Sequence, residues 1–240
     1  PVPKYAHLPM LVNASGKPYS KRDGDAFVGD YREKGFLPDA FFNYLSLLGW
    51  SPGDNREKMT RAELIEAFSI DRAQRSPAQF DLVKLMNLNG LYIAEMPAGE
   101  FEAAVWDFAA RWPWRAHASR ELFRKVAALM QSRTKTYMDA QLWSYFFVDD
   151  FSFDPKAFGK FMKDAAARKA LTDLADLFEK DAPESAAAVE SAIRSVETVY
   201  GIQQGKLNQP LRVALTGITV GAGMYETAEL LGASKCGARI

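Results

Sequence analysis

The second half of this 240-residue chain is dominated by apolar residues that recur at helical spacing. From Pro97 onward this pattern is almost continuous, with short breaks at 112–114 and at Pro183. We expect helices over residues 100–111, 119–130, 137–148, 168–180, 184–200, 210–215 and 225–231. No convincing series of strands follows the first twenty residues. The pattern therefore predicts a mainly α fold whose helices pack face to face.

The first half combines an extended start with further helices. An apolar run over 8–12 is followed by the turn-rich tetrapeptide 13–16, which predicts a short β-hairpin-like start. Pro38 and the capping-box pattern that begins at Thr60 predict the first turns of two helices, and a third is expected over 80–88. The link around residues 95–99 predicts a boundary, so that we expect one domain over 1–95 and an all-helical one over 96–240.

The composition excludes several classes of protein. The formal net charge is +0, so any contact with nucleic acid must come from local patches of charge. One cysteine, Cys236, and two histidines cannot form an internal disulfide or a Cys/His zinc site, and we expect no metal ligands. No apolar run approaches about 20 residues and no signal peptide is visible, so we expect a cytoplasmic protein without membrane contact.

A basic loop in the first domain is the clearest candidate for chemistry. It reads Gly16-Lys17-Pro18-Tyr19-Ser20-Lys21-Arg22. A mobile lysine and a rigid arginine behind a hydroxyl can hold a phosphate chain. The same residues also suit an ordinary solvated surface loop, and the loop alone leaves both interpretations open.

The sequence around this loop resembles the second signature region of the bacterial-type glutamyl-tRNA synthetases. The resemblance covers the segments that read PKYAHLPM, DYREKGFLP and NYLSLLGWS, over residues 3–10, 30–38 and 43–51. A second match, QPLRVALTG over 209–217, resembles the anticodon-binding end of those enzymes. The resemblance implies that 1–95 is a domain contacting the tRNA stem, that 96–240 is a helical anticodon-binding cage, and that the catalytic fold precedes Pro1.

The resemblance also assigns roles to the basic loop. Ser20, Lys21 and Arg22 occupy the class I signature, and Lys21 is the implied ATP contact. Pro18 stands where the signature has its first lysine, so the sequence departs from the family there. The implied cofactors are ATP and Mg²⁺, which only the full-length enzyme would bind. Cations placed beside the phosphates would stabilise the charge that develops as pyrophosphate leaves.

For the second domain the resemblance implies contacts with the anticodon. Arg133 is the implied reader of the third anticodon base, because its planar fork can bind a base edge. The other implied contacts are Arg212, Thr216, Gly221 and Met224. The aromatic residues at 106–114 and 143–147 are expected to be mostly core, with Trp112 and Trp114 the pair expected at the surface.

The function implied by the resemblance is that of a monomeric glutamate–tRNA ligase, of which this chain is the C-terminal portion. Its partners would be tRNA(Glu), with L-glutamate and ATP held through the catalytic fold, and the chain alone is expected to be inactive. A free-standing helical tRNA-binding module without catalysis stays open as an alternative. A glutaminyl enzyme is disfavoured because that branch ends in β-barrels, and a purely structural scaffold is disfavoured by the two separate matches.

Overall fold

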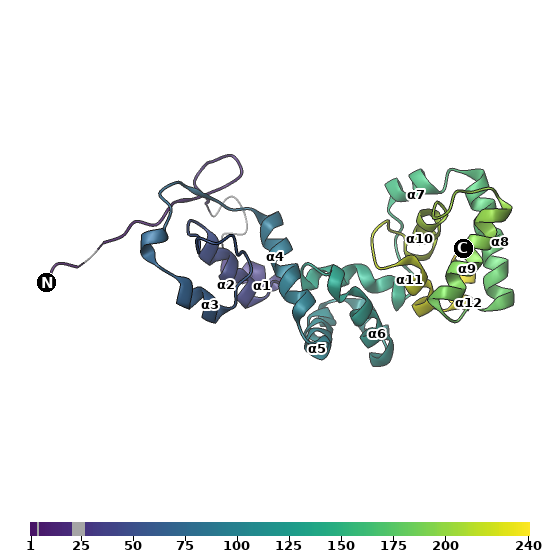
Figure 1. Cartoon of the computed structure of the whole chain (residues 1–240). Coiled ribbons are helices and arrows are strands. Elements are labelled where there is room, and N and C mark those ends of the chain that lie inside the picture. Colours follow the sequence, from purple (N-terminus) through teal and green to yellow (C-terminus); the bar gives the residue numbers. More distant parts are fainter. Residues whose placement is uncertain (4, 21–26) are drawn as a thin grey trace. The chain divides into compact units, whose positions relative to one another are not determined.

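The computed structural model describes residues 1–3, 5–20 and 27–240. The chain forms two compact units (Figure 1). The N-terminal unit contains Pro1–Phe101 and the short segment Thr134–Asp139. The C-terminal unit contains Glu102–Arg133 and Ala140–Ile240. The domain boundary expected between residues 95 and 96 stays a proposal.

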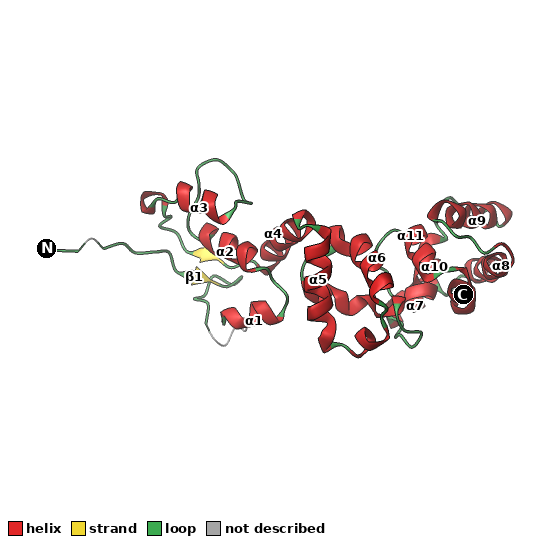
Figure 2. Ribbon diagram, turned by 90° about the horizontal axis from the view of Figure 1, so that it is seen from below, coloured by secondary structure: helices red, strands yellow, loops and turns green. Residues whose placement is uncertain are grey.

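The N-terminal unit starts with a short strand and a tight turn. Strand β1 (Leu11–Val12) pairs in parallel with β2 (Ala78–Gln79), and Figure 2 shows the two strands side by side. After β1 the chain reverses, because the N–H of Tyr19 donates to the carbonyl of Leu11 at 2.8 Å and Val12 forms an antiparallel bridge with Pro18. The hairpin-like start is therefore present. The parallel pairing with β2 was not predicted.

The described part of the N-terminal unit also contains α1 (Val28–Glu33), α2 (Pro38–Leu47), α3 (Arg61–Ala67), a 3₁₀ helix (Ile70–Arg72) and α4 (Leu82–Glu95). Pro38 is the first residue of α2, where its missing N–H costs nothing. Thr60 and Glu63 form the predicted capping box at the start of α3. The core of this unit holds the buried residues Tyr31, Phe36, Tyr44, Leu85 and Leu88.

The returning segment Thr134–Asp139 is held in the N-terminal unit by hydrogen bonds to its main chain, one from a side chain and one with a backbone carbonyl. The side chain of Asn89 is buried in α4, accepts from the N–H of Leu37 at 2.8 Å and donates to the carbonyl of Lys135 at 2.5 Å. The N–H of Tyr137 donates to the carbonyl of Gly35 at 3.1 Å. A segment far along the sequence is thus a structural part of the first unit.

The regular secondary structure described in the C-terminal unit is entirely helical. Helix α5 (Ala98–Phe108) leads into it from the N-terminal unit. The helices that follow are α6 (Arg120–Met130), α7 (Pro155–Phe161), α8 (Ala165–Asp181), α9 (Ala186–Val199), α10 (Asn208–Thr216), α11 (Met224–Leu231) and α12 (Ala233–Arg239). Short 3₁₀ helices connect them over Ala109–Arg111, Pro113–His117, Gln131–Arg133 and Tyr137–Phe146. The predicted mainly α fold is confirmed.

Two details of the C-terminal unit differ from expectation. The stretch predicted as a helix over 137–148 is a 3₁₀ segment, Tyr137–Phe146, with three residues per turn; the apolar spacing did not distinguish this pitch from that of an α-helix. Trp114 was expected at the surface, but it is only 6% exposed. Its ring stacks on that of Phe147 at a centroid distance of 4.9 Å, so packing decides its position. The other predicted core aromatics include Trp143, Tyr145, Phe146 and Phe147, which are buried, and Trp106 and Phe108, which are partly buried.

Candidate functional site

The candidate site in the C-terminal unit is built around α10 and the loop that follows it, residues 217–223, which we call the α10–α11 loop. Arg212 on α10 is 8% exposed, and its Nη2 donates to the carbonyl oxygen of Ala222 at 2.7 Å. Thr216 is buried at the end of α10, and its hydroxyl bonds the carbonyl of Arg212 at 2.7 Å. The Arg212 bond fixes the end of the loop to α10, and at its start the N–H of Ile218 donates to the Thr216 hydroxyl at 3.4 Å.

Close packing at Gly221 brings two further polar groups to the loop. A methyl group in place of its hydrogen would lie 3.0 Å from Nη1 of Arg212 and 3.4 Å from the hydroxyl of Tyr145. Neither of these two buried atoms has a hydrogen-bond partner among the described protein atoms. Burial raises the pKa of Tyr145 to about 12 and lowers the pKa of Arg212 from its ordinary value. The site thus holds two polar groups whose hydrogen-bonding capacity the described protein leaves unused.

The surface of the loop is formed by its middle residues. Val220 is 61% exposed, while Ile218, Thr219 and Gly221 are partly exposed. Met224 begins α11 and is buried, as is Ala222 before it. Among the residues predicted to contact an anticodon, three are therefore buried beneath the surface of the loop: Arg212, Thr216 and Met224. Gly221 is partly exposed at that surface.

Arg133 completes the predicted set from another part of the sequence. It ends the 3₁₀ segment after α6 and is exposed. After the effect of burial, the charge of Arg133 also lowers the pKa of Arg212, so the two guanidinium groups lie within electrostatic reach. The fold therefore brings Arg133 and the α10–α11 loop to one region of the C-terminal unit, although 79 positions separate the two arginines (212 − 133).

The basic loop of the N-terminal unit is described only in part. Lys21 and Arg22 lie outside the described residues, so their predicted roles are not tested. Before them, Ser20 is exposed and the ring of Tyr19 packs against Phe80 at 5.3 Å. Phe80 in turn donates its N–H to the carbonyl of Val12 at 2.9 Å. The base of the loop is thus anchored to the core of its own unit.

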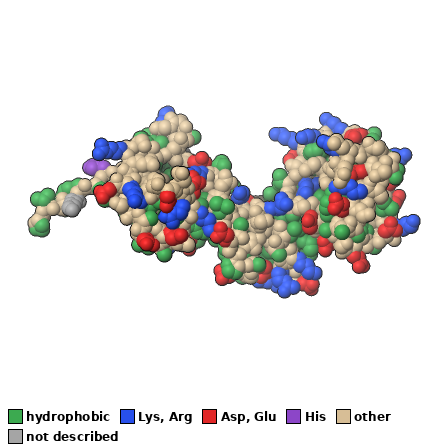
Figure 3. Space-filling model, viewed as in Figure 1, with side chains coloured by type: hydrophobic (Ala, Val, Ile, Leu, Met, Phe, Trp, Pro, Cys, Tyr) green, Lys and Arg blue, Asp and Glu red, His purple; other side chains and the backbone are tan. Residues whose placement is uncertain are grey.

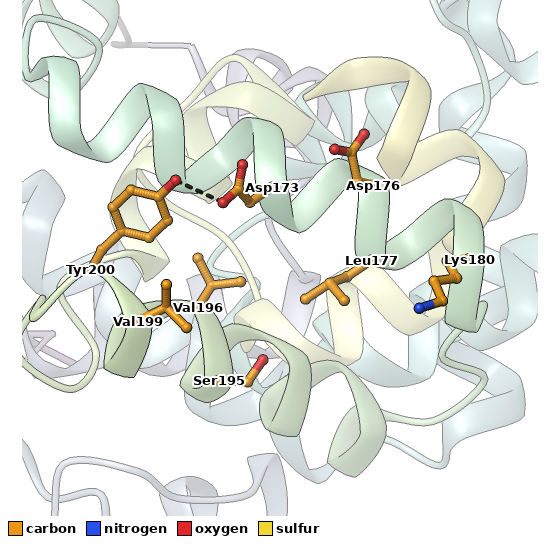
Figure 4. A pocket seen from close by; sticks show the side chains of 8 residues that line it. All are labelled: Asp173, Asp176, Leu177, Lys180, Ser195, Val196, Val199 and Tyr200. Atoms are coloured by element: carbon orange, nitrogen blue, oxygen red, sulfur yellow. Dashed lines mark hydrogen bonds between the residues drawn. The ribbon is translucent and has the colours of Figure 1, made fainter.

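A separate concavity between α8 and α9 has a different character (Figure 4). Asp173, Asp176 and Lys180 surround an apolar floor, and the hydroxyl of Tyr200 donates to Asp173 at 2.6 Å. Two carboxylates against one ammonium repel a polyanion, so this concavity does not suit nucleic acid.

Residues 1–3, 5–20 and 27–240 contain neither a candidate metal cluster nor a candidate membrane-spanning helix. In this part of the chain no group of three or more His, Cys, Asp or Glu side chains could hold a metal ion. Over the same residues, no helix has both the length and the apolar character needed to span a bilayer.

Sequence reasoning did not single out two features of the site. Tyr145 was counted only among the core aromatics, and nothing in its local pattern shows that its hydroxyl faces Gly221. The lysines of α7, Lys156 and Lys160, were also missed. Their spacing of four residues after a helix-starting Asp-Pro pair is a signal that could have found them.

Comparison with known proteins agrees with this geometry. Residues 100–240 match the family described as anticodon binding domain, and residues 1–87 match the catalytic domain of the class I (E and Q) tRNA synthetases. The glutamate–tRNA ligases of Thermobifida fusca and Symbiobacterium thermophilum are 36% and 33% identical over 99% and 98% of this chain. These alignments cover 51% and 50% of the relatives.

A similar result comes from solved structures. A glutamate tRNA ligase from Elizabethkingia meningosepticum matches 99% of this chain with a TM-score of 0.79 and 28% identity, over 50% of its own chain. A glutamate-tRNA synthetase from Elizabethkingia anophelis matches with a TM-score of 0.76 and 28% identity, covering all of this chain and 50% of its own. This chain thus spans about half the length of the relatives that it matches. It belongs to the anticodon binding domain family and is homologous to the C-terminal half of the glutamate–tRNA ligases.

Proposed function

We propose that this chain is the tRNA-recognising part of a glutamate–tRNA ligase, and that its C-terminal unit binds the anticodon loop of tRNA(Glu). The observation that carries this proposal is the α10–α11 loop, whose exposed middle is held by the buried Arg212 bond to Ala222 beside the exposed Arg133. The homology to glutamate–tRNA ligases over nearly the whole chain supports the choice of RNA.

Unpaired bases are recognised when they leave their stack and meet side chains and backbone. Gly221 is partly exposed, so a base can approach its main chain from the solvent side, while Arg212 and Tyr145 occupy the side where a Cβ would stand. Val220 offers an exposed apolar surface beside it. Arg133 can direct a two-pronged set of donors at a base edge, which gives the site its selectivity. Arg212, Thr216 and Met224 keep the loop in place from below.

We further propose that the basic loop of the N-terminal unit serves the activation of glutamate. When bound, ATP with Mg²⁺ would supply the phosphate that the carboxylate of L-glutamate attacks as pyrophosphate leaves. Lys21 would hold a phosphate oxygen, and Tyr19 packed on Phe80 would fix the base of the loop. The complete enzyme would act in the cytoplasm as a monomer, and we expect no glutamate-dependent exchange of pyrophosphate into ATP by the 240-residue chain alone.

The test uses the whole chain and a labelled RNA hairpin with the anticodon stem-loop of tRNA(Glu). We expect saturable binding that weakens as salt rises, and weaker binding of a hairpin that differs only at the third anticodon base. Arg133→Ala should remove most of the preference between these two hairpins, while Lys180→Ala on α8 serves as the matched loss of one charge. Equal affinity of the wild-type chain for both hairpins would overturn the proposed recognition.

A further inference from the structure

A second concavity in the C-terminal unit adjoins the α10–α11 loop but is separate from its tip. It is bordered by α7, by the start of α10 and by the loop itself, and has a volume of about 430 Å³. Four polar side chains that can donate hydrogen bonds line it: Lys156, Lys160, Gln209 and Thr219. In Figure 3, Lys and Arg side chains gather on the surface where Figure 1 places α7.

The two lysines of this concavity form a local excess of positive charge. Lys156 and Lys160 are exposed and stand four residues apart on α7, so they share one face of the helix. Among the described residues neither is paired with an acidic side chain, and Lys160 lies over the ring of Phe161 at 4.9 Å. The acidic member of the lining, Asp154, caps α7 by accepting from the N–H groups of Lys156 and Ala157. The lysine charges are therefore available to an anion.

The concavity is fixed in position against the α10–α11 loop. The N–H of Asp154 donates to the carbonyl of Gly217 at 2.8 Å, which joins the start of α7 to the end of α10. Thr219 lies within the loop and also lines the concavity. The concavity and the exposed part of the loop are therefore contiguous at Thr219, so one RNA strand can contact both.

We propose that Lys156 and Lys160 bind backbone phosphates of the RNA loop whose bases meet the α10–α11 loop. This inference rests on the proposed function and adds a contact that does not depend on base sequence. Lysine suits the task, because a flexible ammonium pairs with phosphate as a point charge without demanding a fixed geometry. The acidic concavity between α8 and α9 has no excess of positive charge. Because the net charge of the whole chain is zero, binding of RNA phosphates requires a local excess of positive charge such as that of α7.

The experiment measures binding of the labelled anticodon stem-loop hairpin to the full 240-residue chain over a series of salt concentrations. The double variant Lys156→Ala/Lys160→Ala is compared with Lys169→Ala/Lys180→Ala, which removes the same charge from α8. We expect the first variant to bind roughly tenfold more weakly at low salt, with the slope of log affinity against log salt reduced by about 1 to 2. The discrimination at the third anticodon base should be unchanged, and the thermal midpoint of both variants should match the wild type.

Three outcomes are distinguishable. The proposal is supported if RNA affinity and the salt slope fall in the α7 variant alone and the variant Lys156→Arg/Lys160→Arg binds RNA as the wild type does. Specific binding by the wild type combined with an unchanged slope in the α7 variant overturns this inference and leaves the proposed function standing. Failure of the wild-type chain to bind the hairpin overturns the proposed function and this inference with it.

Discussion

Nη2 of Arg212 lies 2.7 Å from the carbonyl oxygen of Ala222, and this hydrogen bond joins α10 to the end of the α10–α11 loop. Because Arg212 is buried, its guanidinium acts on the loop from inside the protein. The same side chain leaves Nη1 beside Gly221 without a protein partner among the described residues. We therefore infer that Arg212 supports RNA binding chiefly by holding the loop.

Replacing Arg212 separates this supporting role from direct contact. Arg212→Met keeps an unbranched chain but loses the bond to Ala222, so we expect unfolding free energy to fall by about 1–2 kcal/mol. RNA affinity should fall while its salt dependence stays the same, because no phosphate contact is lost. Binding and urea unfolding of this variant are measured together. A salt slope that drops by about 1 would contradict the supporting role and indicate direct phosphate contact.

Gly217 offers a test of the junction between α10 and α7. Its φ is +74°, and an added methyl group would lie 2.4 Å from the backbone oxygen of Ser152. Gly205 has a similar φ of +83° with no atom within 4 Å of that position. Gly205→Ala should therefore cost about 1–2 kcal/mol from backbone strain alone, and Gly217→Ala about 3–5 kcal/mol because the clash adds to it. Equal losses in thermal unfolding would show that the junction is not tightly packed.

Within the described residues the hydroxyl of Tyr145 has no protein partner, whereas that of Tyr44 donates to the carbonyl of Asp81 at 2.9 Å and accepts from its N–H at 2.7 Å. Tyr145→Phe should therefore change the unfolding free energy by no more than about 0.5 kcal/mol. Tyr44→Phe should cost about 1–3 kcal/mol, because it leaves buried groups unpaired. Chemical denaturation at pH 7 checks both, and a larger loss in Tyr145→Phe would reveal a hydrogen bond at that hydroxyl.

The pKa of Tyr145 adds a pH dependence to the same variant. Burial raises this pKa to about 12, whereas in the unfolded chain it is about 10. The stabilisation that follows from the raised pKa is fully present below about pH 10. It is lost as pH rises towards 12, because the Tyr145 hydroxyl releases its proton at a lower pH in the unfolded chain than in the folded one. Between pH 9 and 11 the wild type should lose about 1.4 kcal/mol more than Tyr145→Phe. Parallel curves for the two proteins would refute the assignment.

Much of this architecture was predictable because its signals are local. Pro38, the Thr60–Glu63 capping box and the periodic apolar residues of α8 and α9 act within one or two turns of helix. The pairing of β1 with β2 joins residues 11 and 78, and a two-residue strand carries no detectable period. The burial of Trp114 was also not predictable, because it depends on Phe147, thirty-three residues later (147 − 114).

The candidate site likewise combines features that local sequence predicts with features that depend on the fold. The resemblance implied Arg212, Gly221 and Arg133, but the burial of Arg212 was not predicted, since a single sequence does not reveal which side of α10 faces inward at a polar position. The bond between Arg212 and Ala222 depends on a loop conformation that no periodicity describes. Lys156 and Lys160 gain their importance only through Gln209 and Thr219, which the fold brings to them.

Glu197 is a buried carboxylate that supports the start of α10. It accepts from the N–H of Leu207 at 3.0 Å and from Nη1 of Arg194 at 2.6 Å. Burial alone would raise its pKa, but these donors outweigh burial and hold the pKa of Glu197 below its usual value. Its stabilisation is therefore present above the unfolded pKa and is lost as pH falls through the folded one.

Glu197→Gln should lower the unfolding free energy at pH 7 by about 2 kcal/mol and make the loss of stability below pH 5 shallower. Glu190→Gln is the matched control. Glu190 lies four residues before Arg194, bonds the same guanidinium and is half-exposed. We expect that control to change stability by about 0.5 kcal/mol or less. Similar effects of the two variants across the pH range would count against the burial argument.

Cys236 provides a readout of unfolding in the last helix. It is buried, and burial raises the pKa of its thiol to about 12. At pH 8 the reactive thiolate is then on the order of one part in ten thousand. Iodoacetamide should label the native chain only after unfolding, at a rate that urea accelerates. Complete labelling within minutes in native buffer would show that the thiol is accessible.

The segment Thr134–Asp139 places a practical limit on how this protein can be divided. Asn89 and Gly35 bond to it from the N-terminal unit, although it follows α5 and α6 in the sequence. A gene fragment that stops near residue 95 would delete these partners and leave a buried amide and a main-chain carbonyl unsatisfied. Expression of the first unit by itself should thus succeed only when Thr134–Asp139 is supplied, either on the same polypeptide or as an added peptide.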